Sequence, residues 1–79
     1  MRKSLIIDKY LKIGLSYGKA LGRISLKKTV NLKELDQLEA EFLKLEELVE
    51  KQGYKPLELE KFIQAGLNNA PLPKLLTKA

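Results

Sequence analysis

The sequence predicts an all-α protein: an antiparallel hairpin of two long helices with a short third helix, together a small three-helix bundle. The composition is rich in Leu, Lys and Glu, with 44% hydrophobic and 32% charged residues, which is typical of helices and not of disorder. In two long stretches, apolar residues recur at alternating spacings of three and four, the period of an amphipathic helix. Capping and turn residues separate these stretches. We therefore expect a single helical domain covering residues 1–79.

The first helix is predicted from about Leu5 to about Leu26, with Ser4 as its N-cap. Its apolar residues form one seam, which we expect to face the second helix. The seam consists of Ile6, Tyr10, Ile13, Tyr17, Ala20 and Ile24. Two of these residues are tyrosines, whose hydroxyl groups need hydrogen-bond partners if they are buried.

A strip of small residues lies beside this seam, with Gly14, Gly18 and Gly22 spaced four residues apart. An interior glycine costs a helix about 1 kcal/mol relative to alanine, so a compensating contact is expected. Together with Ile7 and Leu11, the glycines form a surface that another backbone can approach closely. We predict that this glycine strip is a protein interface, occupied by the third helix or by a second copy of the chain. The alternative is that the glycines only loosen or bend the helix.

Positive charge is concentrated in the first part of the chain. Residues 1–33 hold nine Lys or Arg and one acidic residue, a net charge of +8. Residues 34–79 hold six Lys and nine acidic residues, a net charge of −3. Such asymmetry indicates an anionic partner for the first half, or pairing between subunits.

The cations of the first helix lie on one face, away from its apolar seam. This basic stripe is the candidate nucleic-acid-binding site, and it consists of Lys9, Lys12, Lys19, Arg23, Lys27 and Lys28. The acidic residues of the second helix lie to the other side of its own seam: Asp36, Glu39, Glu46, Glu47 and Glu50. In an antiparallel hairpin the two charged faces are therefore expected to point in opposite directions, which leaves the stripe exposed.

The second helix is predicted from about residue 32 to about residue 52. Asn31 is its expected N-cap, because Glu34 stands three residues later in a capping-box pattern. Gly53 supplies the left-handed residue that commonly follows such a helix. The seam has the heptad spacing of a coiled-coil-like hairpin: Leu35, Leu38, Phe42, Leu45 and Val49. Because the connection is short, the two long helices should be antiparallel neighbours.

The third helix is predicted over about residues 56–68, with Pro56 in its first turn, where the missing N–H costs nothing. The two prolines that follow residue 70 should end it firmly. Residues 71–79 are predicted to be a flexible tail that uses three leucines as a loose latch: Leu72, Leu75 and Leu76.

Catalysis is not expected. The chain has no histidine and no cysteine, which removes Ser/His and Cys/His nucleophilic arrangements, disulfides and the usual zinc ligands. The glycines of the first helix lack the Gly-Lys-Ser/Thr ending of a phosphate-binding loop. We therefore predict a non-enzymatic protein without a cofactor and without a metal site.

The chain is also expected to lack a membrane span and to be cytoplasmic. The apolar run after the basic start ends at Asp8, too early for the roughly seven to fifteen residues of a secretory signal. No window approaches the roughly 20 apolar residues that cross a bilayer.

The leading functional hypothesis is a small accessory protein that assembles through helix packing, as a homo-oligomer or on a larger protein complex, and contacts nucleic-acid backbone through the basic stripe. No aromatic residue interleaves with the stripe and Arg23 is the only arginine on its helix from Leu5 onward, so base readout is not indicated. The contacts should be weakly sequence-specific. One alternative is a purely protein-binding adaptor or subunit. Another is an amphipathic binder at an anionic membrane surface.

Overall fold

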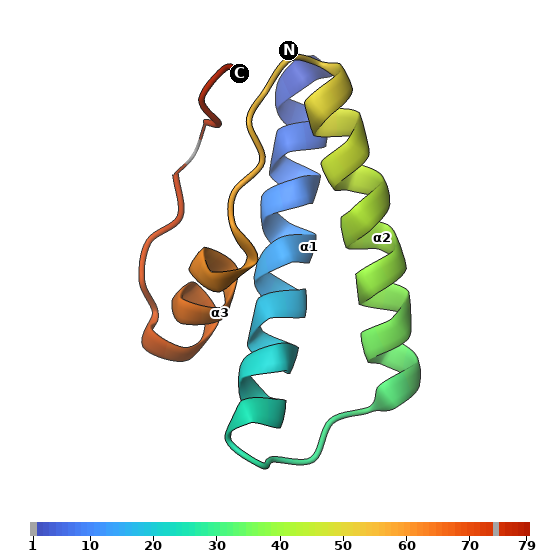
Figure 1. Cartoon of the computed structure of the whole chain (residues 1–79), viewed down its shortest axis with the longest axis vertical. Helices are drawn as coiled ribbons and strands as arrows, with labels where there is room; N and C mark the ends of the chain where they lie inside the picture. Colours follow the sequence, from blue (N-terminus) through green and yellow to red (C-terminus); the bar gives the residue numbers. More distant parts are fainter. Residues whose placement is uncertain (1, 74) are drawn as a thin grey trace.

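The structure, a computed structural model, describes residues 2–73 and 75–79, and their side chains from residue 5 onward. Within these residues it contains three helices: α1 (Arg2–Ser25), α2 (Leu32–Lys51) and α3 (Leu59–Asn68). The two long helices form an antiparallel pair, and α1 lies between α2 and the short α3 (Figure 1). The predicted all-α hairpin with a short third helix is confirmed.

One aromatic side chain from each helix meets the others at the centre of the core. The ring of Tyr10 stacks on that of Phe42, with centroids 5.4 Å apart and an angle of 19°. Phe62 of α3 packs edge-on against both rings, again with centroids 5.4 Å apart. Such stacked and edge-on pairs stabilise a core beyond the apolar area that they bury. The three rings therefore join all three helices in a single cluster.

The seams predicted for α1 and α2 supply most of this core, with Tyr10, Tyr17, Phe42 and Val49 all buried. Ile24 is the exception, since 44% of its surface is exposed. It lies in the last turn of α1, just before the chain leaves the helix for the connection to α2.

The predicted caps of α2 are confirmed. Oδ1 of Asn31 accepts hydrogen bonds from the backbone N–H groups of Lys33 and Glu34, at 3.0 and 3.2 Å. Gly53 has a positive φ of 87°, and its N–H donates to the carbonyl oxygen of Glu50 at 2.9 Å. These contacts satisfy backbone groups that a helix end leaves without an intrahelical partner. The observed ends of α2 consequently lie within one residue of the predicted ones.

The end of α1 uses the same closing pattern without a glycine. Lys27 adopts a left-handed conformation with φ 60°. Its N–H donates to the carbonyl oxygen of Ile24 at 2.9 Å, and the N–H of Lys28 donates to the carbonyl oxygen of Arg23 at 2.8 Å. This pair of bonds is the Schellman motif, which usually places glycine at the left-handed position. The helix therefore ends at Ser25, one residue before the prediction.

Two helix starts differ from the prediction. α1 begins at Arg2, so Ser4 lies within the helix and is not its N-cap. Arginine and lysine are good helix formers, which allows the helix to extend toward the N-terminus. α3 begins at Leu59, three residues later than predicted, and Pro56 belongs to the extended segment before it.

Tyr10 explains why this segment stays extended. Its hydroxyl group accepts a hydrogen bond from the N–H of Leu57 at 3.0 Å and donates one to the carbonyl oxygen of the same residue at 3.3 Å. One buried side chain thus satisfies both backbone groups of Leu57 and holds the segment along α1. Burial, with a smaller contribution from Glu46 and Glu50, raises the pKa of Tyr10 to about 12.

Residues 71–79, predicted to be a flexible tail with a leucine latch, make contacts with the rest of the chain on both sides of residue 74. This C-terminal segment runs back to the end of the molecule that carries the start of α1 (Figure 1). There the N–H of Lys55 donates to the carbonyl oxygen of Thr77 at 2.7 Å. Leu76 is buried in the core, whereas Leu75 is 72% exposed and does not take part in the predicted latch.

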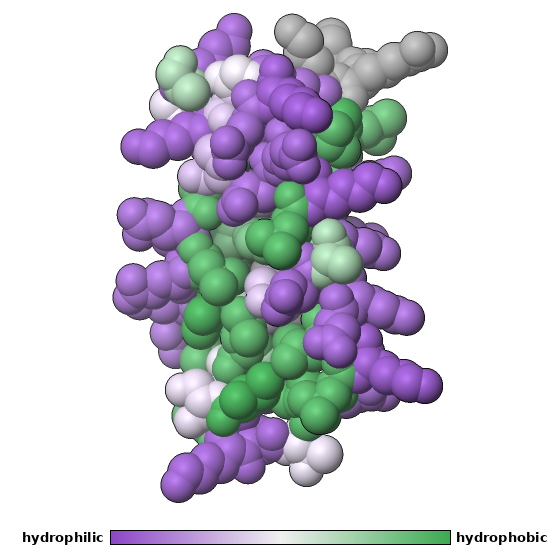
Figure 2. All heavy atoms as spheres, turned by 45° about the vertical axis from the view of Figure 1, so that its right-hand side comes forward, coloured by the Kyte–Doolittle hydropathy of each residue, from purple (hydrophilic) through white to green (hydrophobic). Residues whose placement is uncertain are grey.

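Some apolar surface remains exposed on the long helices. On the side of the molecule that includes α2, hydrophobic side chains gather in a band that is bordered by hydrophilic ones (Figure 2). The exposed large apolar residues of α2 are Leu32 and Leu43, at 70% and 54%. Near the two ends of α1, Leu5 and Leu26 are 59% and 55% exposed.

Candidate nucleic-acid interface

α1 is the central helix, and three of its sides have different surroundings. The first side faces α2, where the rings of Tyr17 and Phe42 lie with centroids 5.4 Å apart. The second side carries the glycine strip and faces α3. The third side carries the basic stripe and is exposed to solvent.

The glycine strip is occupied by α3 of the same chain, the first of the two occupants expected from the sequence. A Cβ atom at Gly18 would lie 2.5 Å from the carbonyl carbon of Phe62. At Gly14 it would meet the ring of Phe62, and at Gly22 the side chain of Leu67, at 2.5 and 2.7 Å. These separations are too short for a real Cβ atom, so the glycines allow α3 to lie close against α1.

α3 also contributes a glycine to the close contact between α1 and α3. A Cβ atom at Gly66 of α3 would lie 2.8 Å from Cα of Lys19. The two other residues predicted for this interface contribute side chains to the core: Ile7 is buried, and Leu11 is partly buried against it. All five residues of the predicted interface therefore lie on the sides of α1 that the chain itself covers.

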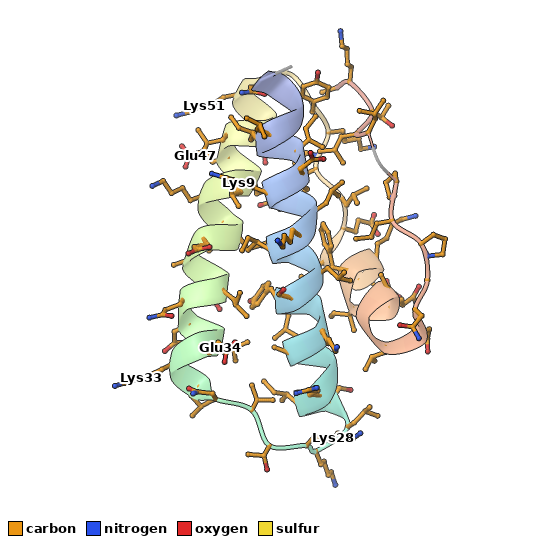
Figure 3. All side chains as sticks on the ribbon, turned by 180° about the vertical axis from the view of Figure 1, so that it is seen from behind. Lys9, Lys28, Lys33, Glu34, Glu47 and Lys51 are labelled. Carbon is orange, nitrogen blue, oxygen red and sulfur yellow. The ribbon has the colours of Figure 1, made fainter. Side chains whose placement is uncertain are left out.

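All six residues of the basic stripe are exposed: Lys9, Lys12, Lys19, Arg23, Lys27 and Lys28. They follow α1 from its N-terminal half to the connection with α2, with Lys28 at the lower end of the molecule and Lys9 well above it (Figure 3). Among the described residues, the ion pair that the structure contains is Lys51 with Glu47, at 3.4 Å, on another helix. The charges of the stripe are therefore available to an external anion.

Two open grooves between α1 and α2 run beside the stripe. The first is lined by Lys9, Lys12, Ile13, Glu41, Lys44, Leu45 and Leu48. The second is lined by Ser16, Lys19, Ala20, Arg23, Thr29, Val30, Asn31, Glu34, Leu35 and Leu38. Four cations of the stripe thus line the two grooves, which we together call the furrow: Lys9, Lys12, Lys19 and Arg23.

The acidic residues that α2 contributes to these grooves are Glu34 and Glu41. Glu34 projects from α2 toward α1 (Figure 3). Neither residue is among the five acidic residues predicted to lie to the other side of the α2 seam, and neither was predicted to lie beside the stripe. The signal was present, since both precede a seam residue directly and must flank it on the helix. The two carboxylates limit how deeply an anion can enter the furrow.

The acidic residues expected on the opposite face lie away from these grooves. Glu39 is placed by Tyr17, whose hydroxyl group donates to Oε2 of Glu39 at 3.2 Å. Burial and this hydrogen bond raise the pKa of Tyr17. Glu46 is half-buried, and desolvation together with the nearby charge of Glu50 raises its pKa.

The tyrosines and phenylalanines of the long helices are not available for stacking with bases. Tyr10 and Phe42 are 0% and 4% exposed, and Tyr17 is 8% exposed. The furrow therefore offers charge and hydrogen-bond donors, and no aromatic platform. Cations of this kind can contact phosphate groups, and the described part of the furrow presents no aromatic surface on which bases stack.

Comparison with protein families, with curated proteins and with solved structures finds no match to this chain. Within the part of the chain that the structure describes, no helix combines the length and apolar character that crossing a bilayer requires.

Proposed function

We propose that this protein is a small non-enzymatic accessory protein that binds the backbone of nucleic acid through the basic stripe on α1. The observation that carries this proposal is the third side of α1: it holds four exposed cations, which Lys27 and Lys28 continue just beyond the helix, and the other two sides of α1 are covered by α2 and α3. Packing on two sides fixes the α1 backbone from which four of these flexible cationic side chains extend. Binding would release counterions from the phosphates and would be strongly salt-dependent.

The length of the stripe supports contact with several phosphates. From Lys9 to Arg23, the cations that lie within α1, a helical rise of 1.5 Å per residue gives roughly 21 Å, and Lys27 and Lys28 continue the stripe beyond the end of the helix. Along one strand of a duplex, successive phosphates are separated by about 3.4 Å of helix axis. Several phosphates of one strand can therefore lie within reach of the stripe.

Double-stranded nucleic acid fits these features better than a single strand. Binding of single strands commonly relies on exposed aromatic side chains on which the bases stack. Here the aromatic side chains of α1 and α2 are buried. A duplex presents its phosphates on the outside and requires no stacking surface, so the charges of the stripe are sufficient for binding with weak sequence preference.

Equilibrium binding to labelled nucleic acid at low salt tests the proposal. Duplexes of two unrelated sequences and of equal length should bind with similar affinity, and a single strand of the same length should bind more weakly. Both affinities should fall steeply as salt is added. Absence of binding at low salt would contradict the proposal. It would favour the alternative in which the protein binds only other proteins.

A further inference from the structure

Two exposed rows of opposite charge lie on the two long helices, and both have heptad spacing. The α1 row consists of Leu5, Lys9, Lys12, Ser16, Lys19, Arg23 and Leu26. The α2 row consists of Leu32, Asp36, Glu39, Leu43, Glu46 and Glu50. In each row the residues alternate at spacings of four and three, so each row runs straight along one side of its helix.

Both rows are exposed over most of their length, although Glu39 accepts a hydrogen bond from Tyr17 and the backbone of Lys19 lies close to Gly66. Every residue of the α1 row is exposed, and so is every residue of the α2 row except the half-buried Glu46. The rows also include the four most exposed leucines of the two long helices and their connection: Leu5, Leu26, Leu32 and Leu43. Leucines that remain exposed within a charged row offer another helix apolar contacts with charges on either side.

The two rows match when they are placed antiparallel. With Leu26 opposite Leu32, each cation of the α1 row faces a carboxylate of the α2 row. The resulting pairs are Arg23 with Asp36, Lys19 with Glu39, Lys12 with Glu46, and Lys9 with Glu50. Leu43 falls opposite Ser16, the small residue in the middle of the α1 row. No cation faces a cation and no carboxylate faces a carboxylate in this alignment.

The same alignment already exists inside one chain. In the hairpin core, Tyr17 lies against Phe42, and Ile13 and Leu45 line one groove. These core pairs align α1 with α2 in one antiparallel register. The facing residues of the two rows follow the same register to within one residue. Copies placed side by side with little shift along the helix axis would therefore bring the rows together in register.

We infer that the α2 row is the docking surface for the α1 row of a second copy of this chain. The interface is heterologous, because it joins two different surfaces. When two copies have joined, one of them still has a free α1 row and the other still has a free α2 row. The contact can therefore be repeated to form a closed ring or an open filament. Exposed ion pairs each stabilise weakly, and we expect association that depends on protein concentration and weakens with salt.

This assembly goes beyond nucleic-acid binding because it requires no nucleic acid. The α1 row shares Lys9, Lys12, Lys19 and Arg23 with the basic stripe. A bound duplex and a docked copy would consequently compete for one surface. Self-association would regulate how much of the stripe is available.

Disulfide cross-linking tests the register directly, since the chain contains no cysteine of its own. Four variants would each carry one cysteine: Lys9→Cys, Arg23→Cys, Asp36→Cys and Glu50→Cys. Mixing Lys9→Cys with Glu50→Cys, or Arg23→Cys with Asp36→Cys, brings together positions that face each other. The crossed mixtures, Lys9→Cys with Asp36→Cys and Arg23→Cys with Glu50→Cys, place the sulfur atoms about 21 Å apart along the helix.

Each mixture removes one cation and one carboxylate, so the crossed mixtures are matched controls. A size tag on one chain of each mixture separates the mixed dimer from the two like dimers. We expect mixed dimers to form several times faster in the facing mixtures than in the crossed ones. Equal rates in all four mixtures would overturn the register and the interface.

Sedimentation without nucleic acid provides a second, independent measurement. At low salt, the average mass of the wild-type protein should rise with concentration, whereas Asp36→Lys/Glu50→Lys should remain monomeric. Glu58→Lys/Glu60→Lys makes the same charge change on exposed residues outside the rows and should associate like the wild type. A wild-type protein that remains monomeric at millimolar concentration would contradict the inference. Neither measurement depends on nucleic-acid binding, so the two proposals can fail separately.

Discussion

Gly18 of α1 lies directly against the backbone of Phe62 in α3. The position that a Cβ atom at residue 18 would take is 2.5 Å from the carbonyl carbon of Phe62 and 2.6 Å from its carbonyl oxygen. A flexible side chain could move away from such a contact, but a helix backbone cannot without displacing the whole helix. The glycine therefore sets the distance between α1 and α3.

Substitution Gly18→Ala should destabilise the protein, although alanine is the better helix former. Helix propensity alone would stabilise the variant by about 1 kcal/mol. The enforced displacement of α3 should outweigh this gain and lower the free energy of unfolding by about 1–3 kcal/mol. Urea unfolding followed by circular dichroism measures the difference. Ser16→Ala is the control, since Ser16 is exposed on the same helix and its replacement should be neutral or stabilising. A Gly18→Ala variant more stable than the wild type would mean that α3 does not pack closely on α1.

Substitution Tyr10→Phe should lower the free energy of unfolding by about 1–3 kcal/mol at pH 7, because it leaves both backbone groups of Leu57 without their partner. The difference should shrink in alkali. In the folded state the pKa of Tyr10 is about 12, above the ordinary value of 10.0, so its stabilisation is complete below pH 10. Above that pH the unfolded chain ionises first, and the stabilisation is lost as the pH rises toward 12.

Urea unfolding of the wild type and of Tyr10→Phe at pH 8, 10 and 11 checks this expectation. All other titrating groups are common to the two proteins, so they cancel in the comparison. A difference in stability that is constant across the three pH values would show that Tyr10 is not buried in its neutral form.

Two neighbouring leucines of the C-terminal segment provide a matched pair. Leu76 is 6% exposed and belongs to the core, whereas Leu75 is 72% exposed. Leu76→Ala should lower the free energy of unfolding by about 2–4 kcal/mol, because it removes buried apolar surface and leaves a cavity. Leu75→Ala should change it by less than about 0.5 kcal/mol. Thermal or urea unfolding measures both. Equal, small effects would indicate that the segment does not close the core.

The sequence was sufficient to predict the helices that its own caps and seams define. Asn31 and Gly53 identify the two ends of α2, because each residue type has a direct hydrogen-bonding or conformational reason to be there. The end of α1 was less accurately predicted, since Lys27 takes the left-handed position that glycine usually fills. No local sequence pattern indicates that a lysine will adopt the left-handed conformation at the end of a helix.

Features that depend on contacts between distant residues could not be predicted. The late start of α3 follows from hydrogen bonds between Tyr10 and Leu57, which are 47 residues apart. The contact between the C-terminal segment and Lys55 likewise joins residues far apart in the sequence. The candidate site was predicted more completely, because helical spacing alone places the cations of the stripe on one face. Its neighbours Glu34 and Glu41 were missed, although each directly precedes a seam residue of α2 and the sequence alone therefore placed it beside the seam.

The salt dependence of duplex binding in two matched triple variants tests the central proposal most directly. Lys12→Gln/Lys19→Gln/Arg23→Gln removes three cations of the stripe, and Lys33→Gln/Lys51→Gln/Lys61→Gln removes three exposed lysines of α2 and α3. Each variant lowers the net charge by three, from +5 to +2. The stripe variant should bind more weakly, with a slope of log K against log salt reduced by about 0.9 for each phosphate that it no longer neutralises. The control variant should keep the wild-type slope. Equal reductions of slope in the two variants would show that binding follows net charge alone and would contradict a site on the third side of α1.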